Sequence, residues 1–245
     1  MTEVGAKLWR ILLPLDVSRD SLTALEAAFD LAAALGGEVS GLFIEDARLL
    51  AAGSLPFARE VGSLSGIRQP IGSLDIERRF QAVADKARDV IGAAAQRLKV
   101  RFSFRVARGD VSAEILTAAT GADMVVLGKA GWSLGTFRKP GSTCLAILSG
   151  SRVPVLITEQ GAALAPPILA VNDNTPAGRR AVEFAQELSR NLQWGIAVFS
   201  VRGMSTGDDV LNSIRQEKPR LIVLPSSLPL TEYVSKLSCA VLVVP

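Results

Sequence analysis

The chain has 245 residues, 49% of them hydrophobic and 21% charged, with a net charge of +3 and a sequence pI of about 9.1. These values indicate a globular protein of one large or two small domains and exclude a disordered chain. The sequence contains no block of Lys and Arg and no long apolar run, so it predicts no nucleic-acid partner and no membrane partner. The chain contains no histidine, which excludes Ser-His-Asp and Cys-His nucleophile pairs and every histidine-based metal site.

Strands and helices are expected to alternate along residues 1–158. The apolar and amphipathic runs predict strands at 8–16, 38–45, 100–107, 122–127 and 153–158, and helices at 19–35, 74–98, 111–120 and 142–148. This alternation implies right-handed crossovers and a parallel sheet, and therefore an α/β fold. Asp110 is expected to cap the helix at 111–120. Residues 46–73, rich in Gly, Ser and Pro, leave two alternatives open: a mobile excursion over the functional site, or a loop with no role.

A repeat connects the two halves of the chain. Ile11–Ile44 aligns without gaps with Ile168–Val201, and Ala122–Leu127 then aligns with Pro219–Leu224 at a shorter separation. The second copy lacks the equivalent of the excursion, the long helix and the third strand. In a flavodoxin-like strand order the third strand lies at an edge, so the remaining strands can still pair. We therefore predict a domain at 1–158, a linker at 159–167 and a truncated second domain at 168–245.

A glycine-bearing loop separates the predicted strand at 122–127 from the next helix. Gly128-Lys129-Ala130-Gly131 opens the loop, and Gly141-Ser142 precedes the helix, with Ser142 a suitable N-cap. Glycines let a ligand approach the backbone amides, and a helix N-terminus attracts anions. The hydroxyl groups of Ser142 and Thr143 add donors. This pattern predicts a phosphate-binding loop, and simple turn geometry is the alternative.

The spacing Gly128-x2-Gly131-x9-Gly141-Ser142 resembles the nucleotide-binding signature of the universal stress protein family, G-x2-G-x9-G-[ST]. Leu12–Ser18, which contains Asp16, and Val153–Ile157 resemble that family's first and closing strands, so the likeness covers residues 7–158. The resemblance implies a flavodoxin-like or Rossmann-like fold that binds ATP, with Mg2+ as a further expectation.

The same resemblance implies a role for each residue of the site. Asp16 and the backbone at Ile44 would contact the adenosine part, and Leu127 and Gly128 would line it. The phosphates would be held by Gly131, Gly141, Ser142 and Thr143. Lys129 is an additional candidate, since its ammonium group can either neutralise phosphate charge or point to solvent.

The resulting hypothesis is an ATP-binding protein of the stress response with no assigned catalytic residue and at most a slow ATPase activity. One alternative is a nucleotide-free structural or adaptor protein with a vestigial site. Another is an enzyme of the related adenine-nucleotide hydrolase or ligase superfamily, although the sequence offers no catalytic constellation for it. The second half carries Pro225–Pro229 in place of the glycine loop and is expected to be empty.

The family resemblance also implies an association between the two halves. Val153–Thr158 and Ala240–Val244 are expected to meet as an intramolecular pseudo-dimer, which would bury two strand edges. Pairing of two chains into a homodimer stays open. Cys144 and Cys239 form no CxxC pair and each suits a buried position, so we expect a cytoplasmic protein without disulfides.

Overall fold

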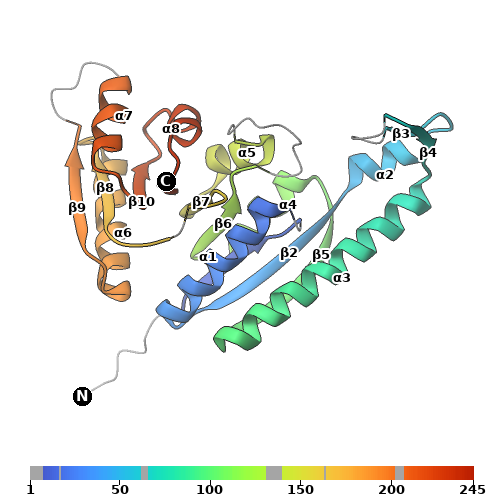
Figure 1. Cartoon of the computed structure of the whole chain (residues 1–245), viewed down its shortest axis with the longest axis horizontal. Helices are drawn as coiled ribbons and strands as arrows, with labels where there is room; N and C mark the ends of the chain where they lie inside the picture. The colour runs from blue at the N-terminus through green and yellow to red at the C-terminus, as the bar shows by residue number, and fades with distance from the viewer. Residues whose placement is uncertain (1–7, 17, 62–65, 131–139, 163, 202–206) are drawn as a thin grey trace.

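The computed structural model describes residues 8–16, 18–61, 66–130, 140–162, 164–201 and 207–245. Strands and helices alternate along both halves, and the fold is α/β, as the sequence predicted (Figure 1). The first half contains β1 (Arg10–Pro14), α1 (Arg19–Leu35), β2 (Glu38–Asp46), α2 (Ala47–Gly53), β3 (Arg59–Val61), β4 (Arg68–Pro70), α3 (Ser73–Leu98), β5 (Arg101–Gly109), α4 (Val111–Ala119), β6 (Met124–Gly128), α5 (Ser142–Gly150) and β7 (Val155–Thr158). The second half contains β8 (Ile168–Asn172), α6 (Pro176–Leu192), β9 (Ile196–Ser200), α7 (Gly207–Gln216), β10 (Leu221–Pro225), α8 (Leu230–Lys236) and β11 (Ala240–Val244). Among the helices of these described ranges, none combines the length and the apolar character needed to cross a membrane.

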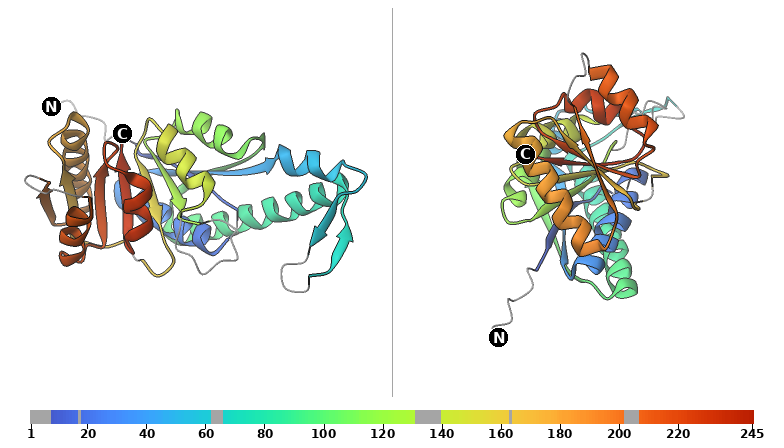
Figure 2. Two further views of the ribbon diagram at one scale, coloured as in Figure 1. Left: turned by 90° about the horizontal axis from the view of Figure 1, so that it is seen from above. Right: turned by 90° about the vertical axis from the view of Figure 1, so that its left-hand side faces the viewer.

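Nine strands form one sheet in the order β5-β2-β1-β6-β7-β11-β10-β8-β9, and β3 and β4 form a separate antiparallel pair. Neighbouring strands of the large sheet are parallel, except that β7 and β11 pair antiparallel where the two halves meet. In Figure 2 the orange and red strands of the second half lie beside those of the first. The two halves therefore share one continuous sheet.

Helix α1 shows how local sequence sets the ends of an element. Ser18 caps its first turn by accepting a hydrogen bond from the amide of Ser21 at 3.2 Å. Gly36 ends it in the left-handed conformation, with a φ of 64°, which glycine adopts without steric cost. Leu25 and Ala28, at helical spacing, are buried against the sheet. These caps and this apolar stripe place the start of α1 beside the carboxyl end of β1.

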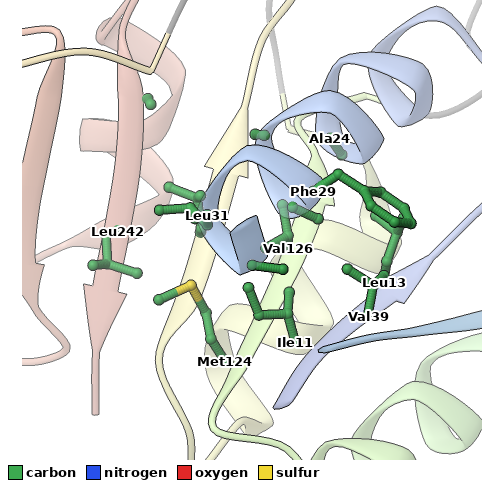
Figure 3. Packing of buried hydrophobic residues seen from close by; sticks show 14 of the residues in the cluster. Ile11, Leu13, Ala24, Phe29, Leu31, Val39, Met124, Val126 and Leu242 are labelled. Carbon is green, nitrogen blue, oxygen red and sulfur yellow. The ribbon is translucent and has the colours of Figure 1, made fainter. Parts of the chain in front are cut away.

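Apolar side chains hold a layer of helices on each face of the sheet. One cluster packs α1, α3 and α6 onto the first face, and it includes Leu13 of β1, Phe29 of α1 and Leu242 of β11 (Figure 3). Trp9 and Phe184 of α6 pack edge to face across the two halves, with ring centroids 5.9 Å apart. A second cluster packs α4, α5, α7 and α8 onto the opposite face. Both clusters contain residues of both halves, so the hydrophobic core is continuous between them.

The second half repeats part of the first in strand order and in register. Ile168 of β8 lies opposite Ile196 of β9, just as Ile11 of β1 lies opposite Val39 of β2. β8, β10 and β11 follow one another in the sheet as β1, β6 and β7 do. Within the described residues, no strand pairs with the outer edge of β9, where β5 pairs with β2 in the first half. The interpretation of this half as a truncated domain, and its bounds, stay predictions.

Residues 46–73 contain regular structure where the sequence analysis expected an irregular segment. Asp46 caps α2 by accepting a hydrogen bond from the amide of Arg48 at 2.9 Å. Glu60 of β3 forms a bidentate ion pair with Arg79 of α3, at 2.6 and 2.8 Å. The segment is therefore shaped by a helix cap and by contacts with α3, and its Gly, Ser and Pro content did not reveal either.

Candidate functional site

A cavity of about 520 Å3 lies at the carboxyl ends of β1, β2 and β6, beside the N-terminus of α5. β1 and β6 are neighbours in the sheet although α1 to α4 separate them in sequence, so the winding direction changes between them. Ligands of open parallel sheets bind at such points. Leu42, Phe80 and Val83 contribute to an apolar wall, and the start of α5 forms a polar one.

The cavity brings together eight of the nine residues that the sequence analysis assigned to a nucleotide site. They come from the ends of β1, β2 and β6 and from the first turn of α5. The eight are Asp16, Ile44, Leu127, Gly128, Lys129, Gly141, Ser142 and Thr143. Gly131 lies outside the described residues. The shared location agrees with the assignment, and the role of each residue in binding stays a prediction.

The N-terminus of α5 is capped by Gly141, one residue earlier than predicted. The sequence analysis expected Ser142 as the N-cap, but Ser142 is the first residue of the helix. Gly141 has an extended backbone, with φ of −66° and ψ of 160°, and it has no side chain that could accept from the first turn. Because the first amides of a helix have no partner within it, they offer donors to an anion in the cavity.

Gly128 lies at the closest approach between β6 and the start of α1. A Cβ atom at Gly128 would lie 2.7 Å from the carbonyl carbon of Asp20 and 2.8 Å from its Cβ. The Asp20 carboxylate also accepts a hydrogen bond from the amide of Ala130 at 2.9 Å. The first turn of α1 therefore holds the start of the binding loop. The N-cap of α1 is Ser18, which leaves the Asp20 carboxylate available for this contact.

Replacing Gly128 by Ala should destabilise the protein by about 1–3 kcal/mol, because the new methyl group would force β6 and α1 apart. Urea unfolding measures this change. Gly195→Ala is the matched control, since a Cβ there meets no atom within 4 Å. Equal midpoints for the two variants would contradict the close packing at Gly128.

Lys129 does not direct its ammonium group to phosphate or to solvent, the two alternatives that its sequence position left open. The side chain is buried, and Nζ donates to Oε2 of Glu159 at 2.9 Å and to the carbonyl oxygen of Leu237 at 3.1 Å. Two of its three donors are thus used within the chain. Its partners lie 30 and 108 residues away, and no local pattern indicates either contact.

Asp16 follows β1 and lines the cavity. Its Oδ1 atom accepts a hydrogen bond from the amide of Ser18 at 3.0 Å, and its own amide donates to Oγ of Ser21 at 3.1 Å. These bonds fix the turn between β1 and α1 and hold the Asp16 carboxyl group at the cavity wall.

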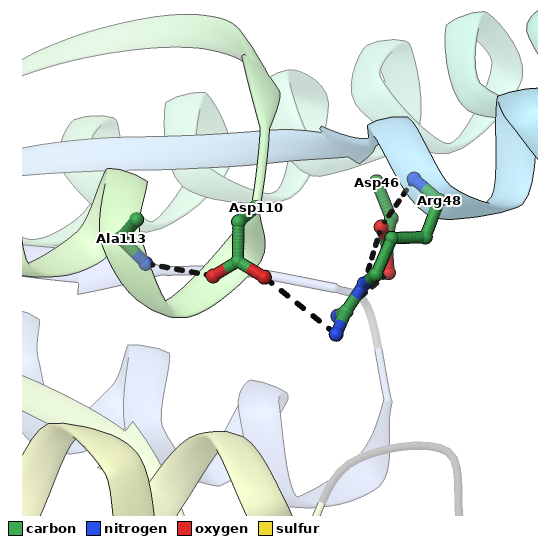
Figure 4. Close-up of polar contacts among 4 residues, drawn as sticks. All are labelled: Asp46, Arg48, Asp110 and Ala113. Atoms are coloured by element: carbon green, nitrogen blue, oxygen red, sulfur yellow. Dashed lines mark hydrogen bonds and ion pairs between the residues drawn. The ribbon is translucent and has the colours of Figure 1, made fainter.

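Asp46 is a cavity residue that the sequence analysis missed, and it belongs to a cluster of charges (Figure 4). Its carboxylate accepts hydrogen bonds from Nε and a terminal nitrogen of Arg48, each at 3.1 Å. These bonds lower the pKa of Asp46 below its usual value. Arg48 also lies 3.6 Å from Asp110, which caps α4 through the amide of Ala113 as predicted. Asp46 is the last residue of β2, and its position at the end of a strand beside the site could have indicated that it lines the cavity.

Burial shifts the titration of both cysteines. Cys144, in the first turn of α5, lines the cavity, and burial raises its pKa to about 12 despite the opposing charge of Lys129. Burial also raises the pKa of Cys239, to about 11. Both shifts favour the protonated thiol over the thiolate at neutral pH.

Comparison with known proteins identifies the family. The model of the universal stress protein family matches residues 9–159, which is more than half of the chain. The chain belongs to the universal stress protein family. No curated protein sequence matches it significantly.

Several solved structures are similar to this universal stress protein, and the first two share its fold. A universal stress protein from Archaeoglobus fulgidus DSM 4304 is 18% identical, with a TM-score of 0.69 over 96% of this chain and 97% of its own. Protein PA1789 from Pseudomonas aeruginosa PAO1, described as functionally unknown, is 15% identical, with a TM-score of 0.60 over 98% and 93% of the two chains. A universal stress protein solved in complex with cAMP is 19% identical, with a TM-score of 0.42 over 63% and 98%.

The second half of this universal stress protein uses the equivalent strand ends for internal contacts. Asp173, the counterpart of Asp16, accepts hydrogen bonds from the hydroxyl groups of Thr175 and Ser227. Ser227 lies in Pro225–Pro229, the segment that replaces the glycine loop. Burial alone would raise the pKa of Asp173, but these hydrogen bonds outweigh it and the pKa is lowered. The carboxyl group is thus used to hold the second half together.

Replacing Asp173 by Asn should cost about 1 kcal/mol of stability at neutral pH. Because folding lowers the pKa of Asp173, its stabilisation is fully present above the unfolded value of about 3.9 and is lost as the pH falls through the folded value. Urea unfolding of the wild type and of Asp173→Asn at several pH values between about 7 and 2 should therefore show that the difference in their free energies of unfolding becomes smaller in acid. A difference that stays constant over this range would contradict the role of the Asp173 charge.

Proposed function

We propose that this universal stress protein binds one adenine nucleotide in the cavity of its first half and acts in the response to stress. ATP is the nucleotide that we expect, with Mg2+ as a further expectation. The main support for this proposal is the start of α5, where Gly141 leaves the first-turn amides without a side-chain acceptor. These amides and the positive end of the helix dipole suit a phosphate chain.

The cavity fits such a ligand in size and in chemistry. Its volume of about 520 Å3 lies within the range of small-molecule sites. The Asp16 carboxyl group and the backbone of Ile44 would contact the adenosine part, which Leu127 and Gly128 would line. The phosphates would be held by Gly131, Gly141, Ser142 and Thr143. Mg2+ would enter on the phosphate oxygens, since the described ranges hold no group of three acidic or thiol side chains that could bind it alone.

Binding rather than efficient turnover is the proposed activity. Fast phosphoryl transfer needs a positioned carboxylate or metal ligand beside the phosphates. Asp123 precedes β6, at the end of that strand opposite Gly128, and its carboxylate accepts a hydrogen bond from the amide of Arg10 at 2.9 Å. We therefore propose at most a slow ATPase, with no catalytic residue assigned.

The second half is proposed to be a degenerate universal stress protein domain at 168–245, joined through a linker at 159–167. The antiparallel pairing of β7 and β11 supports a pseudo-dimer within one chain. The internal hydrogen bonds of Asp173 support an empty second site. The cytoplasmic location and a homodimer of two chains also stay predictions.

One observation favours the alternative of an adaptor protein with a vestigial site. The ammonium group of Lys129 lies next to the loop, but Glu159 neutralises it at 2.9 Å. The cavity therefore gains less positive charge than the sequence suggested.

Nucleotide that co-purifies with the protein distinguishes the two functions. The protein would be purified without added nucleotide and denatured, and the supernatant would be analysed by chromatography. The proposal expects an adenine nucleotide near one equivalent per chain, or, if the protein is purified empty, a saturable titration with ATP and Mg2+. Neither bound nucleotide nor titration would overturn the proposal and favour the adaptor.

A further inference from the structure

The side chain of Lys129 connects the proposed binding loop to the second half of the chain. It is 3% exposed, and its Nζ atom lies 2.9 Å from Oε2 of Glu159 and 3.1 Å from the carbonyl oxygen of Leu237. Leu237 is the C-cap residue of α8, and Glu159 follows β7. A buried ammonium group is tolerated only when it is paired and hydrogen-bonded. The end of α8 must therefore stay against the loop for as long as Lys129 is buried.

The backbone of the same residue is bonded to the end of β7 and to the cap of α5. The amide of Lys129 donates to the carbonyl oxygen of Thr158 at 2.8 Å, and its carbonyl oxygen accepts from the amide of Gly141 at 3.0 Å. Lys129 thus lies where the chain leaves β6, and it is bonded to the residue that caps α5. Lys129 therefore contributes to the position of the first-turn amides relative to the cavity.

Charge is not the contribution of Lys129, because Glu159 compensates it at 2.9 Å. The contribution of Lys129 is instead to fix the relative positions of its partners. Its backbone is bonded to β7 and to the cap of α5, and its side chain to the segment after β7 and to the end of α8. Holding the start of α5 in its bound position in advance raises affinity, since binding of the ligand then does not have to order it.

We propose that Lys129 is a positioning residue through which the second half of the chain holds the start of α5, and with it the proposed phosphate site, in its binding position. This inference rests on the proposed function of the first half. The half that is expected to be empty then acts as a support for the other. Because such coupling is reciprocal, a ligand in the cavity must also stabilise the end of α8.

Three variants separate geometry from charge and from stability. Lys129→Met removes the hydrogen bond to Leu237 and also the ion pair with Glu159. Lys129→Met combined with Glu159→Gln removes both charges of this ion pair and keeps the net charge of the wild type, so neither charge of the pair remains without the other. Lys236→Met is the matched control, because Lys236 adjoins Leu237 but pairs at the surface with Asp208 and Glu232.

Titration with ATP and Mg2+ by calorimetry, together with urea unfolding, gives the first readout. We expect affinity about 10-fold weaker in both Lys129 variants, near-normal stability in the double variant, and no change in Lys236→Met. If the double variant binds as tightly as the wild type, Lys129 acts through charge or stability and the inference is overturned. If the wild type binds no nucleotide, the proposed function and the inference both fail.

Hydrogen exchange of the unmodified protein gives a readout that needs no variant. Saturating ATP and Mg2+ should slow exchange of the amides at 233–240, at the end of α8, as well as those at the start of α5. Slower exchange at α5 without any change at 233–240 would overturn the inference while leaving the proposed nucleotide site intact.

Discussion

Replacing Gly141 by Asp should abolish nucleotide binding and leave the fold intact. The extended backbone of Gly141 suits any N-cap residue, so an aspartate there would accept hydrogen bonds from the first turn of α5. The same carboxylate would occupy the amides that the phosphates need, and its charge would repel them. We expect affinity for ATP to fall by about 100-fold or more, since two like charges in close contact within a site cost several kcal/mol.

Calorimetric titration and thermal unfolding of the same samples test this expectation. Gly195→Asp is the matched control, since it adds the same charge in open space at the start of β9. Gly141→Asp should unfold at a temperature equal to or above that of the wild type. A Gly141→Asp protein that binds ATP with unchanged affinity would show that the start of α5 is not the phosphate site.

Replacing Val241 by Asp should prevent the two halves from joining. Val241 of β11 is 2% exposed and lies opposite Ile157 of β7, in the antiparallel pair that connects the halves. An unpaired carboxylate in this position would cost about 3–5 kcal/mol, a large part of the stability of a typical domain. Opening of the pair would expose two apolar strand edges, which associate readily with other chains. We expect aggregates in size-exclusion chromatography, and the same from Val155→Asp.

Val198→Asp is the control for these variants, because Val198 lies on the edge strand β9 and is 49% exposed. It should elute as the wild type does. A single monodisperse peak for Val241→Asp, at the elution volume of the wild type, would contradict the role of the β7–β11 pair.

The strands and most helices could be predicted because their signals are local. A buried strand such as Met124–Gly128 is a continuous apolar run, and α1 carries an apolar stripe with a serine before it and a glycine after it. The α/β class then followed from the alternation of these elements. The strand pairing between the halves came from the family resemblance, since nothing local encodes which edges meet.

The site was predictable in its location and less so in its contacts. The spacing of the glycines indicated where a ligand can approach the backbone, and eight of the predicted residues line one cavity. The partners of Lys129 could not be predicted, because its ion pair with Glu159 and its hydrogen bond to Leu237 join residues 30 and 108 positions apart. The predicted cap of α5 was wrong by one residue, because serine, the residue at 142, is a more frequent N-cap than glycine, the residue at 141. The contact of Asp20 with the loop arises only when α1 packs against β6.

The number of nucleotides bound per chain tests the account most directly. Native mass spectrometry of the intact protein with saturating ATP and Mg2+ would count them, with Gly141→Asp measured alongside. We expect one nucleotide per chain in the wild type and none in the variant. Two nucleotides would contradict the expectation that the second half is empty, and none in the wild type would contradict the proposed site altogether.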